Sequence, residues 1–216
     1  MELKRSYGLI VNHKKILKIM KRNELKTRIR VKKYYSYKEK AVYKKACRNL
    51  LNRKFSPSYP DRVDCGDITE LQYQNGKCYL YAVQDQGTKE IVSYCVTEKP
   101  TSELIVKTYS ARLLKLSRHK RKILISHTDQ GGQFLSDTYK YTLKKLDVTQ
   151  SMSEKGNCLD NAPIESFFGH LKDEVDYKNC HDFLEVKKRV ESHITYYNND
   201  RPQWGLKGKT PAECRG

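Results

Sequence analysis

The order of strand-like and helix-like patterns after Pro60 constrains the fold of this chain more than any other feature. Three runs with strand character follow one another over residues 63–73, 77–84 and 90–97, with only short turns between them. Strands in series joined by short turns favour an antiparallel meander. Beyond residue 100 helix-like and strand-like patterns alternate, which predicts a sheet covered by helices.

The second half of the chain completes this alternation. The expected elements are, in order, a helix over 102–117, a strand over 122–126, a helix over 136–146, a strand over 148–152, a helix that starts near Pro163 and a helix over 182–198. The run over 122–126 is short and apolar, so we expect it to be buried between helices. The helix over 102–117 is expected to bury the side that carries Leu104, Ile105, Thr108, Ala111, Leu114 and Leu116. This order predicts an α/β fold, a ribonuclease H-like mixed five-stranded sheet flanked by helices.

Positive charge is concentrated at one end of the chain. Residues 1–60 carry 19 Lys and Arg against 3 Asp and Glu, whereas residues 61–216 carry 24 against 22. A basic segment joined to a nearly neutral globule predicts a polyanionic partner. The seven cysteines are odd in number and never spaced C-x-x-C, which favours free thiols in a reducing cytoplasm over a zinc site. With no apolar run of about 18 residues and no signal peptide, we expect a cytoplasmic protein that does not enter a membrane.

The basic end contains one clear helical pattern, over residues 12–22. Asn12 is placed to cap it, and its polar surface carries Lys14, Lys15 and Lys18. A short basic helix of this kind can enter a groove of DNA, but a solvated basic helix has the same composition. Residues 23–60 mix lysine and arginine with tyrosine, which predicts a linker with one or two helical turns over 37–51. Such a linker suits a DNA backbone and suits solvent equally well.

Three carboxylates stand out by their positions. Asp67 lies inside the first strand, Asp129 directly follows the buried run after residue 122, and Glu165 lies in the first turn of the helix near Pro163. That helix has Asp160 or Asn161 as its expected cap. Its apolar stripe consists of Ile164, Phe167, Phe168, Leu171 and Val175. Lys172 lies two turns after Glu165 on the same face.

The first and fourth strands are neighbours in the expected sheet, so the three acids can meet at one edge. Clustered anions raise one another's pKa, and cations relieve this repulsion. Oxygen ligands suit Mg²⁺ or Mn²⁺, and two ions roughly 3.5–4 Å apart would support phosphodiester displacement. A first-turn acid also simply offsets the helix dipole, and that alternative remains open for Glu165. His127 can assist near Asp129 or can be a structural histidine after a buried strand.

Several stretches resemble the transposases of bacterial insertion sequences that carry a retroviral-integrase-like core, in particular the second-frame proteins of two-frame elements. These stretches are residues 49–55 (NLLNRKF), 67–70 (DITE), 127–131 (HTDQG), 150–153, 155–162 (KGNCLDNA), 165–169 (ESFFG), 196–201 and 210–211. Asp129 and Glu165 have 35 residues between them, the separation recorded in the family's name for its acidic triad.

The resemblance implies roles for individual residues. Asp67, Asp129 and Glu165 match the three catalytic metal ligands, and Lys172 matches a lysine thought to hold substrate DNA. Residues 11–20 resemble the last helix of a helix-turn-helix segment. We therefore expect a partial helix-turn-helix remnant over 1–22, a basic linker over 23–60 and an integrase-like catalytic core over 61–216.

The resemblance also implies an activity and its partners. We expect Mg²⁺- or Mn²⁺-dependent cleavage at the ends of an insertion element, followed by attack of the 3′-OH on target DNA. The expected partners are double-stranded DNA, further copies of the chain on that DNA, and the first-frame product as a fusion. The expected location is the nucleoid of a bacterial cytoplasm.

Some residues depart from the family pattern. Asp64 and Gly66 stand where tryptophan and threonine are usual, and helices expected ahead of Asn12 are missing. Asp64 and Asp67 lie on opposite sides of the strand by parity, so Asp64 is not expected to be a fourth ligand. A truncated, non-catalytic DNA-binding remnant that occupies element ends or inhibits the full transposase is therefore the alternative. A nuclease on the same fold is a third.

Overall fold

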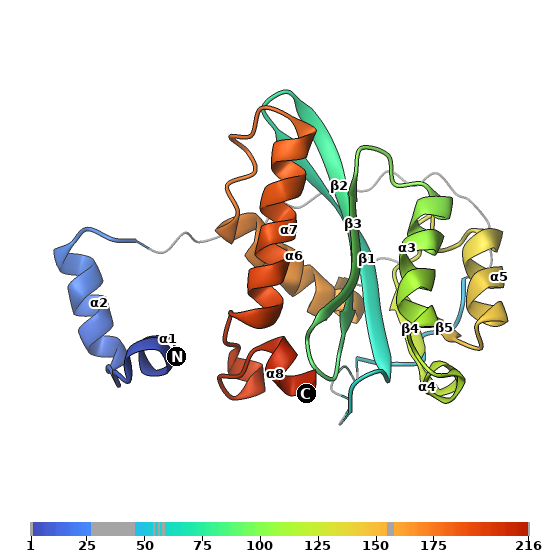
Figure 1. Cartoon of the computed structure of the whole chain (residues 1–216), viewed down its shortest axis with the longest axis horizontal. Helices are drawn as coiled ribbons and strands as arrows, with labels where there is room; N and C mark the ends of the chain where they lie inside the picture. Colours follow the sequence, from blue (N-terminus) through green and yellow to red (C-terminus); the bar gives the residue numbers. More distant parts are fainter. Residues whose placement is uncertain are drawn as a thin grey trace.

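A five-stranded sheet in the order β3-β2-β1-β4-β5 forms the centre of the molecule (Figure 1). The computed structural model describes residues 2–26, 46–53, 55, 57, 59–154 and 158–215. The strands are β1 (Val63–Tyr73), β2 (Gly76–Asp85), β3 (Ile91–Thr97), β4 (Ile125–Thr128) and β5 (Thr149–Met152). The first three pair antiparallel, whereas β4 pairs in parallel with β1 and β5 in parallel with β4. The expected meander and mixed sheet are confirmed.

Helices cover both faces of this sheet (Figure 1). On one face α6 (Ala162–Glu174) and α7 (Phe183–Asn199) bury their apolar stripes, and Phe167, Leu171 and Val190 join the first of two hydrophobic cores. On the other face α3 (Ser102–Leu114) and α5 (Asp137–Lys145) enclose the second core, which contains Ile105 and Leu143. Short elements complete the connections, namely α4 (Arg118–Ile123), η1 (Cys158–Asn161), η2 (Trp204–Leu206) and α8 (Pro211–Arg215).

Two expectations about the region between α3 and β4 are wrong. The strand expected over 122–126 starts later, because α4 continues to Ile123, with Ser117 Oγ accepting from the Lys120 amide at its start. The expected inner side of α3 is also wrong, since Leu114 is exposed while Tyr109 and Arg112 are buried. Tyr109 binds the buried Asp64 and Arg112 binds the buried Asp61 through their polar ends. A search for apolar residues at helical spacing does not detect such inward-facing polar side chains.

An ionic cluster centred on the buried Asp61 lies just ahead of β1. Asp61 is buried and binds the guanidinium groups of Arg112 and Arg215 and the ammonium group of Lys120, at 3.0 Å for Arg215 and 2.8 Å for Lys120. Arg215 belongs to α8 and also pairs with Glu90. Burial alone would raise the pKa of Asp61, but hydrogen bonds from Lys120, Arg112 and Arg215 outweigh burial and hold it well below its ordinary value. The cluster thus ties α3, α4 and α8 to the base of the sheet.

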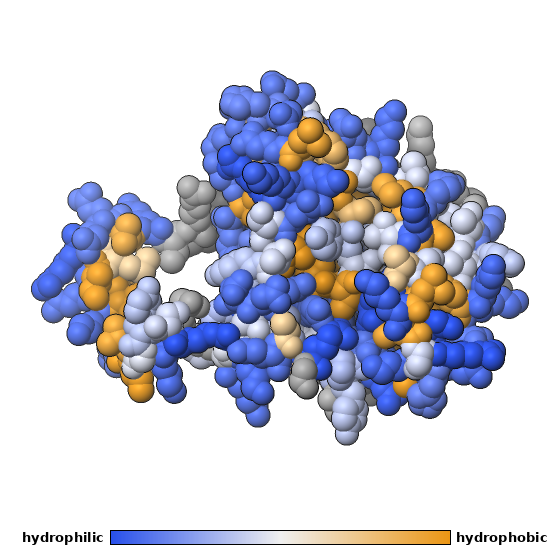
Figure 2. Space-filling view, in the orientation of Figure 1, coloured by the Kyte–Doolittle hydropathy of each residue, from blue (hydrophilic) through white to orange (hydrophobic). Residues whose placement is uncertain are grey.

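The basic helix expected over 12–22 is present as α2 (His13–Arg22), and Asn12 Oδ1 caps it by accepting from the Lys14 amide at 2.9 Å. A short helix, α1 (Glu2–Tyr7), precedes it, which corrects the expectation that no helix lies ahead of Asn12. α2 buries none of its residues, and Figure 2 shows apolar side chains of this segment at the surface. Arg5 of α1 forms two hydrogen bonds with Glu213 of α8, at 3.0 and 2.8 Å.

The linker expected over 23–60 is described only in part. Of the helical turns expected over 37–51, residues 37–45 lie outside the described residues, and residues 46–50 are not helical. None of the helices in the described ranges is both long and apolar enough to cross a membrane.

Candidate active site

Asp67 and Asp129 are brought together by the parallel pairing of β1 with β4. The register runs from Val63 opposite Ile125 to Gly66 opposite Thr128, so each aspartate is the next residue along its chain. Asp67 lies within β1 at the point where the pairing with β4 stops, and Asp129 directly follows β4, so the two aspartates lie side by side. One oxygen of each carboxylate accepts a backbone hydrogen bond, from the Ile68 amide at 2.7 Å and from the Gly131 amide at 2.9 Å.

Helix α6 carries Glu165 to the same edge. Ile164, Phe167 and Phe168 are buried against β1 and β2, and this packing leaves Glu165 exposed in the first turn. Pro163 lies in that turn as expected, but the expected cap is wrong, because Asn161 makes no capping hydrogen bond. Asp160 does not cap the helix either, since its carboxylate binds Asn49 and Arg53 instead.

The three acids and Lys172 influence one another electrostatically. Burial, together with the nearby charges of Asp129 and Glu165, raises the pKa of Asp67 to about 8, although the Ile68 amide and Lys172 oppose the shift. Burial also raises the pKa of Asp129, against the Gly131 amide, and burial together with Asp129 raises that of Glu165. The carboxyl groups of Asp67, Asp129 and Glu165 therefore all have raised pKa values, as expected for neighbouring acids that are withdrawn from water.

The carboxylate donors fit Mg²⁺ or Mn²⁺ by their chemistry, since these ions prefer oxygen ligands and keep several waters. Among the residues that the structure describes, no three His, Cys, Asp or Glu side chains are grouped so that they could hold a metal ion. The three acids are therefore within electrostatic reach of one another without forming a closed coordination shell.

Other residues named from the sequence lie elsewhere. Lys14, Lys15 and Lys18 are exposed on α2, which lies outside the layers of sheet and helices (Figure 1). His127 is buried and has both ring nitrogens engaged, with Ser151 Oγ at 2.9 Å and the Asp160 carbonyl at 2.8 Å. These contacts agree with the interpretation of His127 as a structural histidine.

Sequence reasoning missed the role of Asp160. Its carboxylate accepts hydrogen bonds from Asn49 at 3.1 Å, from Arg53 at 2.9 Å and from the Glu154 amide at 3.2 Å. These contacts hold residues 46–53 against the start of α6 and, through the Asp160 carbonyl, against His127. The family resemblance of residues 49–55 was the only available signal, and spacing alone could not pair residues more than 100 positions apart.

Asp64 lies on the opposite side of β1 from Asp67, as parity predicts. It is fully buried and accepts a hydrogen bond from Tyr109 Oη of α3 at 2.9 Å. Burial raises the pKa of Asp64 to about 7, with Arg112 opposing the shift and Asp85 adding to it. Asp64 therefore belongs to the core under α3 and does not face the acidic edge.

The raised pKa of Asp64 makes a prediction about stability. Between about pH 4 and pH 7 the folded protein binds a proton at Asp64 that the unfolded chain has released, so stability falls as pH rises through this window. We expect the free energy of unfolding to fall by about 1–2 kcal/mol between pH 5 and pH 7 because of this group. Asp64→Asn should remove that part of the decline, as measured by urea unfolding at both pH values. An identical decline in the variant would contradict this assignment.

Comparisons with known proteins agree with this fold. A family described as "Integrase core domain" matches residues 57–158, and a second family of the same description matches residues 146–211. The putative transposase InsK for insertion sequence element IS150 of Escherichia coli is 37% identical over 209 residues, which are 96% of this chain and 72% of that protein. An uncharacterized transposase-like protein of Haemophilus influenzae is 37% identical over 206 residues, covering 95% of this chain and 93% of that protein.

A solved structure shows the same fold. The catalytic core domain of HTLV-2 integrase, solved in complex with magnesium in a dimeric form, superposes with a TM-score of 0.55 at 17% identity, over 73% of this chain and 98% of that one. This likeness confirms the ribonuclease H-like arrangement expected from the order of elements. Together with the two relatives, it shows that this chain belongs to the insertion-sequence transposases that carry an integrase-like core.

Proposed function

We propose that this transposase cuts DNA at the ends of an insertion element and joins the freed ends to target DNA, with Asp67, Asp129 and Glu165 as its metal ligands. The observation that supports the proposal is the parallel register of β1 and β4, which places Asp67 beside Asp129 at the edge that Glu165 approaches on α6. The match to the integrase core domain and the membership of the insertion-sequence transposases support the same phosphodiester chemistry.

Two displacements at phosphorus make up the reaction. Water first attacks the phosphodiester at the element end, and the bond from phosphorus to the 3′ oxygen breaks, which leaves a free 3′-OH. That hydroxyl then attacks a target phosphodiester, forms a new bond from phosphorus to oxygen and releases a 3′-OH of the target. Divalent cations, when bound, supply Lewis-acid stabilisation of the attacking and leaving oxygens. No side chain serves as a covalent nucleophile.

The chain's own residues bind and orient the DNA. Asp67, Asp129 and Glu165 hold two Mg²⁺ or Mn²⁺ ions as carboxylates, while Lys172 binds a phosphate near them. Lys14, Lys15 and Lys18 contact the backbone of double-stranded DNA, since exposed lysines on a helix provide sequence-independent affinity. The active form is an oligomer on DNA in the bacterial cytoplasm, with the first-frame product as a fusion partner.

The second candidate is a non-catalytic DNA-binding remnant. Two observations favour it. No residue of α2 is buried, so its apolar side lacks a packing partner, and the described acids are not grouped closely enough to hold a metal ion. In that case the basic segment of residues 1–60 occupies element ends and inhibits a complete transposase.

One assay separates these candidates. The full-length protein is incubated with a pre-nicked oligonucleotide of the element end, a supercoiled plasmid and Mg²⁺ or Mn²⁺. We expect joined products that disappear with EDTA. Salt-dependent binding without any metal-dependent reaction would support the remnant instead, and hydrolysis without joining would indicate a nuclease.

A further inference from the structure

A rigid turn after α7 presents the protein's single tryptophan to solvent. Trp204 is 84% exposed, and the backbone around it is closed by several hydrogen bonds. The Gln203 amide donates to the Lys209 carbonyl at 3.0 Å, the Gly208 amide to the Gln203 carbonyl at 2.9 Å, and the Lys207 amide to the Trp204 carbonyl at 3.0 Å. Such an exposed indole on a hydrogen-bonded turn adds nothing to the hydrophobic core and is open to contact from solvent.

The turn is tied to the helix that carries Glu165. Arg201, just before the turn, binds both carboxylate oxygens of Glu174 at the end of α6, with the shortest contact at 2.7 Å. Arg201 also lies over the Tyr197 ring of α7, 5.9 Å from its centroid. Nine residues of helix separate Glu165 from Glu174, a rise of roughly 13 Å. Through Arg201 and Glu174 the turn is therefore tied to the far end of the helix that carries Glu165.

A pocket of about 540 Å³ opens beside the indole. His170, Glu174, Tyr196, Arg201, Pro202, Gln203, Trp204 and Gly205 line it. Its size lies within the range of roughly 300–1,000 Å³ that is usual for ligand pockets. Because Arg201 neutralises Glu174, the pocket does not present an unpaired carboxylate to an anionic ligand.

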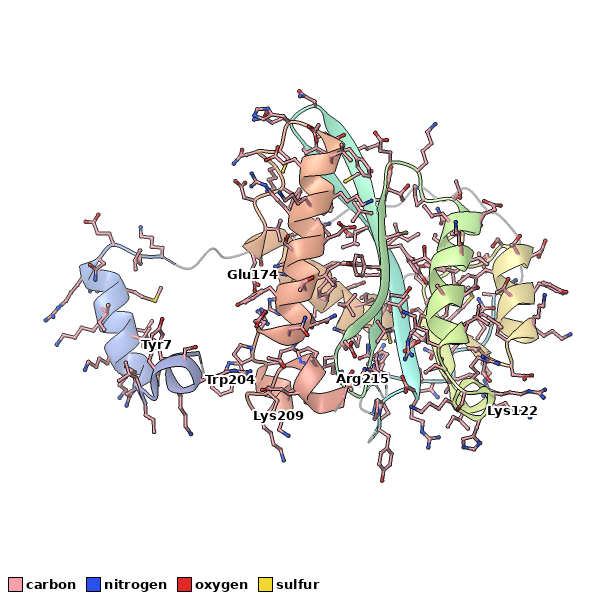
Figure 3. The ribbon with its side chains drawn as sticks, viewed as in Figure 1. Tyr7, Lys122, Glu174, Trp204, Lys209 and Arg215 are labelled. Atoms are coloured by element: carbon pink, nitrogen blue, oxygen red, sulfur yellow. The ribbon has the colours of Figure 1, made fainter. Side chains whose placement is uncertain are left out.

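Two exposed lysines lie close to Trp204 in the sequence. Lys207 and Lys209 follow Trp204 in the same turn and are both exposed. Figure 3 shows Glu174, Trp204 and Lys209 along one margin of the core. An exposed aromatic ring flanked by lysines is the arrangement with which proteins bind single-stranded nucleic acid, since the ring stacks on a base and the lysines bind phosphates.

We propose that the Trp204 turn binds an unstacked nucleobase of a single-stranded DNA segment, with Lys207 and Lys209 on the adjoining phosphates. This inference rests on the proposed function, because it takes DNA as the substrate. It adds a second DNA contact, apart from the acidic edge where the phosphodiester reacts. Such a contact would keep the opened end of the element from pairing again.

The single tryptophan allows a direct test. Emission excited at 295 nm reports on Trp204, and fluorescence anisotropy of a labelled oligonucleotide reports on binding by the whole chain. Both are measured on the full-length protein with EDTA present, so that neither depends on catalysis. We expect a single-stranded oligonucleotide, or a duplex with a single-stranded tail, to quench Trp204 emission, and a blunt duplex to leave it unchanged.

Variants separate stacking from general binding. Trp204→Ala should weaken single-strand binding about tenfold, whereas Trp204→Phe keeps a ring and should stay within about threefold. Tyr141→Ala, which removes an exposed aromatic ring on α5, is the matched control and should bind as the wild type does.

The possible results separate the two proposals. If anisotropy rises while Trp204 emission stays constant, this inference is overturned and the proposed function stands. If neither changes, both are overturned. Emission that shifts with protein concentration alone would show that a second copy covers Trp204, and emission that shifts on Arg5→Ala would show that the α1 segment covers it. Either of these results, without quenching by DNA, also overturns the inference.

Discussion

Replacing Asp129 with asparagine, or Glu165 with glutamine, should abolish strand transfer while DNA binding persists. If these carboxylates hold the catalytic cations, each substitution removes several kcal/mol of transition-state stabilisation, so we expect joined product to fall by about a thousandfold or more. The fold should be unaffected. Asp129 lies just past β4, and an asparagine oxygen there can still accept from the Gly131 amide.

The pKa values of the acids sharpen this prediction. Burial and mutual repulsion raise the pKa values of Asp67 and Glu165, so the cluster is unfavourable without a cation. Removing one charge should therefore leave the melting temperature of the metal-free protein unchanged or raise it, while activity is lost. A variant that is both inactive and strongly destabilised would indicate a structural role instead.

A matched control comes from α3. Glu103→Gln removes a first-turn acid from a helix that packs against β3 and α5, so it tests the loss of the helix-dipole interaction by itself. We expect this variant to join DNA ends as the wild type does. Strand transfer by Asp129→Asn or Glu165→Gln at the wild-type rate would refute the assignment of the catalytic site.

Asp61→Ala should be the most destabilising substitution that we predict outside the site. It leaves the buried guanidinium of Arg112 without its ionic partner and releases Lys120 and Arg215 as well. Removing one member of a buried ion pair costs about 3–5 kcal/mol, and we expect that loss in chemical denaturation at pH 7. Arg118→Ala is the control, since its ion pair with Asp147 is solvent-exposed and should contribute little to stability.

The same carboxyl sets a dependence on pH. Hydrogen bonds from Lys120, Arg112 and Arg215 outweigh burial and lower the pKa of Asp61 in the folded state. Its contribution is therefore complete above the unfolded pKa of about 4 and is lost as pH falls towards the lowered folded pKa. The difference between wild type and Asp61→Ala should shrink in acid, and a difference that grows below pH 4 would contradict this account.

The fold was largely predictable because its signals are local. β1 has the bounds expected from its pattern, and α7 buries Val186, Val190 and Ile194 along the expected stripe. The errors occurred where polar side chains turn inward. α3 buries Tyr109 and Arg112 in place of Leu114, because Asp64 and Asp61 lie beneath it.

The sequence named the three acids of the candidate site, which remain a prediction, but it did not indicate their surroundings. Family resemblance and position in the chain named Asp67, Asp129 and Glu165, and the parallel register of β1 and β4 explains why the two aspartates lie side by side. The anchoring of residues 46–53 by Asp160 and the Arg201–Glu174 tie behind Trp204 join segments far apart in the chain. The spacing of apolar and polar residues along the sequence does not indicate such long-range pairs.

By itself the sequence determined the order of strands and helices, the class of sheet and the identity of the three acids, since each follows from the period of apolar residues, from local position or from a matched motif. Only the tertiary structure decided which polar side chains are buried and paired. A buried charge is tolerated where a partner from elsewhere in the chain reaches it, and that depends on contacts made when the layers pack.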